Sequence, residues 1–174
     1  MLRTTLMAEE DSRISISNEK RYWEMIVSIA SDHAGYPLRR DVADYLSKQG
    51  HTVIEGGATS ADVPYSYVLA GQKVSKDVLE GKAERGIVVC GTGIGISMVA
   101  NKFPGIRCAL CTNEFMSRMC RQHNDANVLA MGARVIGKGV AFGIVDAFMN
   151  EAFDGGRHMS RVNDMKEQEK ELFK

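Results

Sequence analysis

The chain has 174 residues, of which 44% are hydrophobic and 25% are charged, and its 22 basic residues balance its 22 acidic residues. This length fits one domain with a sizeable core, and zero net charge excludes attraction of the whole molecule to nucleic acid or an anionic membrane. The sequence contains no apolar run long enough to span a bilayer and no recognisable targeting signal, so it predicts a cytoplasmic protein.

Strand and helix patterns alternate along the chain. Residues 1–24 show no clean period, which predicts a flexible N-terminal extension to a single α/β domain at 25–174. Short apolar, β-branched runs predict five strands, at 26–30, 51–54, 86–90, 106–111 and 128–131. Helical spacing predicts helices at 38–46, 68–79, from 97 to 102, 115–123 and 140–150, and a charged C-terminal helix after 158. This order predicts a Rossmann-like three-layer sandwich with a five-stranded parallel sheet and a C-terminal helix.

Polar and glycine-rich residues follow three of the predicted strands. Asp32 and His33 follow the first strand, residues 90–95 end the third, and residues 132–134 follow the fifth. Ligands of open parallel sheets bind beyond the carboxyl ends of the strands. We therefore expect a binding site at this edge of the sheet.

A glycine loop follows the third strand and opens a helix. Backbone N–H groups of Gly91, Gly93 and Gly95 can hold an anion there, although a tight turn alone also needs one or two glycines. Three glycines with Thr92 between them favour a ligand. The G-x-G-x-G spacing and the place after the third strand argue against a dinucleotide site, so no cofactor is expected.

The four cysteines divide into one candidate for chemistry and three for packing. Cys90 ends the third strand, where a helix N-terminus favours the thiolate, but a small buried residue is an equally good interpretation. Cys108 and Cys111 form C-x-x-C, and Cys120 with His123 forms C-x-x-H, which together imitate a zinc pattern. Residues three apart on a strand point to opposite faces, so core packing is expected and no metal.

Histidines and arginines supply the remaining candidates. Asp32-His33 and His123-Asn124-Asp125 have the character of site residues, while capping or burial is the alternative. Arg157 and Arg161 share one face of a predicted helix and, with Arg134, can form a fork for phosphate. A solvated charged face is the competing interpretation of that pair.

Five ordered segments between residues 26 and 165 closely resemble the type B ribose-5-phosphate isomerases. They are Ser31-Asp32-His33-Ala34-Gly35, Cys90-Gly91-Thr92-Gly93-Ile94-Gly95-Ile96-Ser97, Asn101-Lys102, Arg121-Gln122-His123-Asn124-Asp125-Ala126-Asn127 and Gly155-Gly156-Arg157-His158. The subunits of galactose-6-phosphate isomerase belong to the same superfamily.

The resemblance implies a metal-independent, cofactor-free isomerase of the pentose phosphate pathway that converts ribose 5-phosphate to ribulose 5-phosphate through an enediolate. It also implies a homodimer or a dimer of dimers with active sites shared between subunits. By analogy, Cys90 moves the proton between C2 and C1, while His123 and Asp32 assist ring opening. The loop with Thr92 holds the enediolate oxygens. The implied phosphate ligands are His33, Arg134, Arg157 and Arg161, with His123, Asn124 and Arg134 expected from the neighbouring subunit.

One stretch departs from the family pattern. The family commonly has D-Y-P-x-Y after the second strand, whereas Val63 and Ser66 stand at the two tyrosine positions here. Tyr65 and Tyr67 are the candidates to replace them. The alternatives are therefore isomerisation of allose or galactose 6-phosphate, or a non-enzymatic sugar-phosphate-binding protein. Retention of both Cys90 and His123 argues against a pure binding protein.

Overall fold

The computed structural model describes residues 24–173, so the predicted extension lies outside the described residues except for Glu24. The five strands are β1 (Ile26–Ser31), β2 (Thr52–Gly57), β3 (Arg85–Cys90), β4 (Cys108–Leu110) and β5 (Val128–Gly132). The helices are α2 (Tyr36–Lys48), α3 (Tyr67–Leu79), α4 (Ile94–Ala100), α5 (Glu114–Asn124), α6 (Lys138–Asn150) and α7 (Gly156–Leu172). None of these helices is both long and apolar enough to cross a bilayer.

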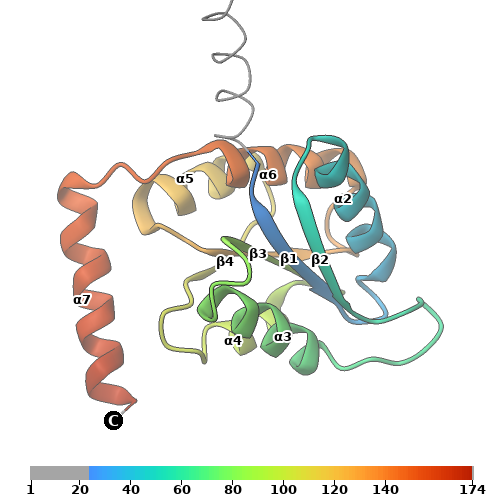
Figure 1. Cartoon of the computed structure of the whole chain (residues 1–174), viewed down its shortest axis with the longest axis horizontal. Helices are drawn as coiled ribbons and strands as arrows, with labels where there is room; N and C mark the ends of the chain where they lie inside the picture. The colour runs from blue at the N-terminus through green and yellow to red at the C-terminus, as the bar shows by residue number, and fades with distance from the viewer. Residues whose placement is uncertain (1–23, 174) are drawn as a thin grey trace, which may run out of the picture.

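The strands form one parallel sheet in the order β2-β1-β3-β5-β4. The chain moves outward from β1 to β2, then returns to the other side of β1 to form β3, so the strand order reverses between β1 and β3. Helices α2, α5 and α6 lie on one face of the sheet and α3 and α4 on the other (Figure 1). The predicted three-layer α/β sandwich is confirmed.

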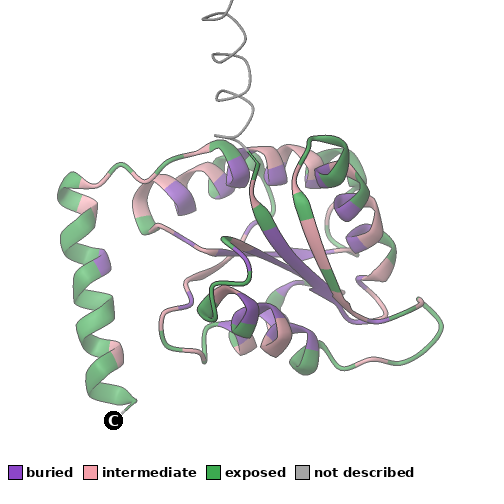
Figure 2. Cartoon of the chain, viewed as in Figure 1, coloured by how far each residue is buried: buried purple, intermediate pink, exposed green. Residues whose placement is uncertain are grey.

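Side chains alternate along the central strands and divide the core into two clusters. Ile87 and Val89 of β3 pack with α2, α5 and α6, whereas Val88 and Cys90 pack with α3 and α4. Every residue of β5 is buried, as expected for a strand covered on both faces (Figure 2). Alternate residues of each continuous apolar run thus contribute to the two core clusters on opposite faces of the sheet.

The fourth strand is shorter than predicted, because the chain before it uses its N–H groups elsewhere. The N–H of Ile106 donates to the carbonyl of Phe103 in a turn, and the N–H of Arg107 donates to Asn127 Oδ1 at 2.8 Å. Pairing with β5 therefore begins at Cys108. Cys108 packs toward the α3–α4 face and Cys111 toward the opposite face, so the predicted separation of this pair is confirmed.

Helix α7 stands at the edge of the molecule, beyond α5 (Figure 1). Val162 is its one buried residue among those that the structure describes, and Glu169 accepts a hydrogen bond from the N–H of Gly105 at 3.0 Å. A cavity of about 440 Å³ lies between α7 and the β4 edge, lined among others by Asn124, Cys108 and Met165. Most of α7 therefore remains exposed in the single chain.

Candidate active site

The ends of β1, β3 and β5 are joined by backbone hydrogen bonds into one surface. The N–H of Asp32 donates to the carbonyl of Val89, and the N–H groups of Ala133 and Arg134 donate to the carbonyls of Cys90 and Gly91. The three loops that follow the central strands are thus fixed relative to one another. This is the edge where the sequence predicted a site.

Asp32 and Cys90 are buried at this surface, with little of either side chain exposed. Asp32 Oδ1 accepts the N–H of Gly35 at 2.8 Å, which closes the turn before α2. Cys90 Sγ accepts the N–H of Gly93 at 3.1 Å. That hydrogen bond fixes the sulfur against the glycine loop.

The structure explains two of the three glycines of the loop. Gly93 adopts a left-handed conformation, with φ 79°. A Cβ on Gly95 would lie 2.9 Å from the ring of Tyr67. Gly91 has neither restriction, since a Cβ there would meet the Arg134 side chain at an ordinary 3.6 Å. Neither a positive φ nor a close neighbour therefore requires glycine at position 91.

Arg134 lies beside Gly91 in the same chain, and its side chain is exposed. The analogy had placed this arginine on the neighbouring subunit, whereas β5 delivers it directly to the end of β3. Its guanidinium therefore faces the loop that includes Thr92, whose Oγ1 accepts the N–H of Ile94 at 3.3 Å.

The two residues that depart from the family pattern after β2, Val63 and Ser66, lie in the segment that leads into α3. Ser66 is the N-cap of α3, and its hydroxyl accepts the N–H of Val68 at 3.2 Å. Tyr67, one position later, packs its ring over Gly95, while Val63 is exposed. The N–H of Tyr65 lies 3.3 Å from His33 Nδ1 and holds that ring beside the segment. Tyr67 thus contacts the loop at Gly95.

The remaining predicted residues form a second group at the opposite end of the strands, where the strands begin. Helix α5 runs back toward the start of β5 and ends with His123 and Asn124, while Arg157 and Arg161 are exposed on α7. Cys90 is the last residue of β3, so the two groups lie at opposite ends of the parallel strands. Five or six residues of strand separate them, or roughly 17–20 Å. One chain does not bring all predicted site residues together.

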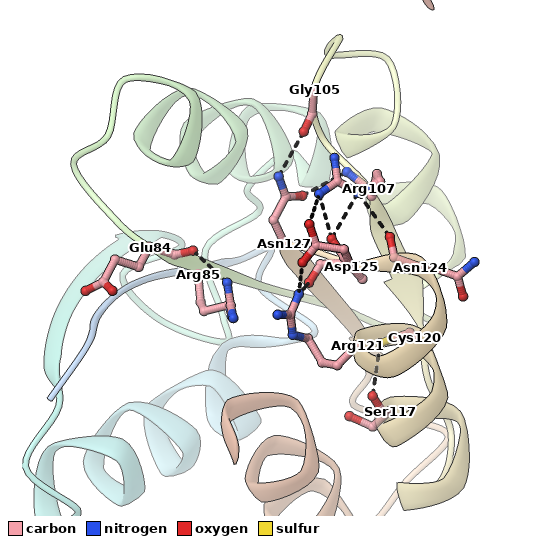
Figure 3. Close-up of polar contacts among 11 residues, drawn as sticks. Glu84, Arg85, Gly105, Arg107, Ser117, Cys120, Arg121, Asn124, Asp125 and Asn127 are labelled. Atoms are coloured by element: carbon pink, nitrogen blue, oxygen red, sulfur yellow. Dashed lines mark hydrogen bonds and ion pairs between the residues drawn. The ribbon is translucent and has the colours of Figure 1, made fainter. Parts of the chain in front are cut away.

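A buried charge network of Arg107, Arg121 and Asp125 fixes the end of α5, so Asp125, a candidate site residue by sequence, is engaged in ion pairs within the chain. Arg121 is nearly fully buried and donates to Asp125 Oδ1 at 2.9 Å and to the carbonyl of Ala126. Arg107 donates to Asp125 Oδ2 at 2.8 Å and to the carbonyls of Asn124 and Asp125. Figure 3 shows these side chains pointing toward one another. Asp125 has a left-handed φ of 47°, which ends the helix beside the predicted site residues.

Comparison with known proteins identifies the relatives of this chain. The sequence pattern of the Ribose/Galactose Isomerase family matches residues 27–165. Ribose-5-phosphate isomerase B of Escherichia coli (strain K12) is 40% identical over 136 residues, which cover 78% of this chain and 91% of the relative. Galactose-6-phosphate isomerase subunit LacB of Clostridium acetobutylicum is 37% identical over 129 residues, 74% of each protein. Ribose-5-phosphate isomerase B of Clostridium thermocellum has a structure that matches with a TM-score of 0.83 at 50% identity, covering 85% of this chain and 99% of that one.

Proposed function

The chain belongs to the ribose/galactose isomerase family of sugar-phosphate isomerases, and we propose that it interconverts ribose 5-phosphate and ribulose 5-phosphate without a metal. The observation that carries the proposal is the convergence of Asp32, Cys90 and the loop at Gly91 on one surface. The cytoplasm and the pentose phosphate pathway are its proposed setting.

In this proposal Cys90 moves the proton between C2 and C1 of the open-chain sugar. Its sulfur accepts a hydrogen bond from the N–H of Gly93. It lies at the carboxyl ends of β1, β3 and β5, where polar residues follow each strand. The proton beside a carbonyl is weakly acidic, so the enediolate needs donors that are already in place. Loop N–H groups and Thr92 are the donors available. Asp32 and His123 would assist ring opening.

The phosphate would bind to His33, Arg134, Arg157 and Arg161. Arg134 already lies at the loop, while the other two arginines lie on α7. Arg157→Ala or Arg161→Ala should lower kcat/KM on ribose 5-phosphate by roughly 10–150-fold, the equivalent of a lost charged hydrogen bond of about 1.5–3 kcal/mol. Activity on free ribose should change little. Equal losses on both sugars would remove these residues from the phosphate site.

A second copy of the chain would complete the site. Four predicted site residues lie at the end of the strands opposite Cys90, namely His123, Asn124, Arg157 and Arg161. Helix α7 is largely exposed. Both facts fit a homodimer, or a dimer of dimers, in which one subunit supplies Cys90 and its neighbour supplies His123. Arg134 would belong to the Cys90 side of this shared site.

Mixed dimers test the shared site directly. Cys90→Ala and His123→Asn should each lose most activity as homodimers. When the two variants are unfolded and refolded together, half the dimers become mixed, and each mixed dimer regains one intact site of two. Activity should then recover to about a quarter of wild type. No recovery, with mixed dimers shown by mass spectrometry, would refute a site shared in this way.

The altered stretch at Val63 and Ser66 favours one second candidate, a different sugar phosphate. The missing tyrosines change the wall beside the loop, so allose 6-phosphate or galactose 6-phosphate is the alternative substrate. A panel of pentose and hexose phosphates, assayed in EDTA, decides between them. We expect the highest kcat/KM on ribose 5-phosphate, and Cys90→Ala should lower kcat while phosphate-ligand affinity stays nearly unchanged.

A further inference from the structure

Two histidines and a carboxylate converge at the junction of α5 and α7. The side-chain ligand atoms of His123, Asp154 and His158 all lie within 4.8 Å of one another. The rings of His123 and His158 are stacked, with centroids 4.1 Å apart and planes 7° from parallel. Among residues 24–173, no other group of three such side chains converges in this way.

The backbone holds this cluster in place from three segments. His123 lies in the last turn of α5, Asp154 in the connection from α6, and His158 in the first turn of α7. The N–H of Asp154 donates to the carbonyl of Gln122 at 3.0 Å, which fixes the connection against α5. The N–H of His158 donates to the carbonyl of Gly155 at 2.9 Å.

This set matches the chemistry of a divalent transition metal. Two imidazole nitrogens and one carboxylate oxygen are preferred ligands of Zn²⁺, at about 2.0–2.2 Å from the ion. Neighbouring ligand atoms around one ion then lie about 3–3.5 Å apart. The three side chains are half-buried or exposed, so they have room to rotate. The nitrogen lone pairs lie in the planes of the imidazole rings, so ion binding requires the two rings to rotate out of their present stack until both planes meet at the ion. Arg157 Nε lies 3.4 Å from His158 Nε2 and would be displaced by the ion.

We infer that His123, Asp154 and His158 form a site for Zn²⁺ or a similar divalent ion, and that the bound ion inhibits the isomerase. The inhibition, though not the binding, rests on the proposed role of His123 in ring opening. The bound ion takes the nitrogen lone pair of His123 that proton transfer needs, and it displaces Arg157 from its place beside the cluster. Catalysis itself proceeds without a metal, so chelator gives full activity.

Calorimetric titration of EDTA-stripped protein with ZnCl₂ tests the binding. Wild type should bind one Zn²⁺ per chain, and Asp154→Asn and His158→Asn should each weaken binding at least about tenfold. His51→Asn is the matched control, because His51 lies outside the cluster and should leave the affinity unchanged. Cys90→Ser should also bind one Zn²⁺. Absence of stoichiometric binding, or equal affinity in wild type and both cluster variants, overturns the site.

Activity then tests the inhibition separately. In EDTA, wild type and Asp154→Asn should have similar activity, and Zn²⁺ at a concentration that saturates wild type should inhibit wild type at least tenfold more than the variant. Excess EDTA should restore wild type. Equal inhibition of both proteins would place the inhibitory ion elsewhere and overturn this inference. Inactivity of wild type in EDTA toward the whole sugar panel would instead refute the proposed function, while calorimetry would still decide the metal site.

Discussion

Replacement of Gly93 by alanine should destabilise the protein and damage the candidate site together. Position 93 has a φ of 79°, and its N–H is the donor to Cys90 Sγ. A methyl group there would overlap Leu110 Cδ1 and lie 2.9 Å from the carbonyl carbon of Met131. The leucine methyl is able to move aside, but the β5 backbone is held in the sheet.

Two contributions set the magnitude. A left-handed conformation costs a non-glycine residue roughly 1–2 kcal/mol, and overpacking a dense interior costs roughly 1–3 kcal/mol. Together they give about 2–5 kcal/mol, a large part of the about 5–15 kcal/mol that stabilises a typical domain. For a chain of this size the melting temperature should fall by roughly 4–20 °C.

The matched control is Gly139→Ala in the first turn of α6. A Cβ at position 139 would enter open space, with no neighbouring side chain within 4 Å, and the backbone there has no positive φ. Alanine should therefore be neutral or should stabilise by up to about 1 kcal/mol. Thermal unfolding followed by circular dichroism measures both variants. If Gly93→Ala melts at the temperature of wild type, or no lower than Gly139→Ala, then neither the left-handed φ nor the close packing at position 93 requires glycine.

Three further predictions concern groups away from the loop. Arg107→Ala should lower the free energy of unfolding by about 1.5–3 kcal/mol, because it removes charged hydrogen bonds to Asp125. Arg118→Ala, which breaks a partly exposed ion pair with Glu151, should lower it by less than about 1 kcal/mol. Equal urea midpoints for the two variants would contradict this. Burial lowers the pKa of His51 below 6.5, so the unfolded chain binds more protons and stability should fall as pH drops through 6.5; His51→Gln should flatten that dependence of the melting temperature. Burial raises the pKa of Cys108 to about 12, so this thiol should resist iodoacetamide at pH 8 in the native protein, as peptide mass mapping would show.

Local patterns were sufficient to predict the layers of the fold. A continuous apolar run such as residues 86–90 is buried on both faces in any parallel sheet, so it identifies a central strand without knowledge of its neighbours. Cys108 and Cys111 likewise lie toward opposite faces of the sheet, as the alternation of side chains along a strand predicts. Local patterns also located Asp32, Cys90 and the glycine loop at one edge, since parallel strands end together.

Contacts between segments far apart in the sequence are not predicted by local patterns. The start of β4 depends on the Asn127 side chain, because the N–H of Arg107 donates to Asn127 Oδ1 and not to a neighbouring strand. The cluster of His123 with His158 joins residues whose meeting depends on where α7 leaves the sheet. Helix and strand periods describe which face of an element is apolar, but they carry no information about such partners.

The sequence by itself therefore determined the layers, the parallel sheet and the edge that carries Cys90, because each follows from the period of one segment at a time. Only the tertiary structure decided which predicted residues can meet. It placed Arg134 beside Gly91, because Arg134 follows the carboxyl end of β5. It placed His123 at the opposite end of the strands, because α5 runs back to the start of β5. It also showed that Ser66 caps α3 and that Tyr67 contacts the glycine loop, because the first turn of α3 packs against Gly95.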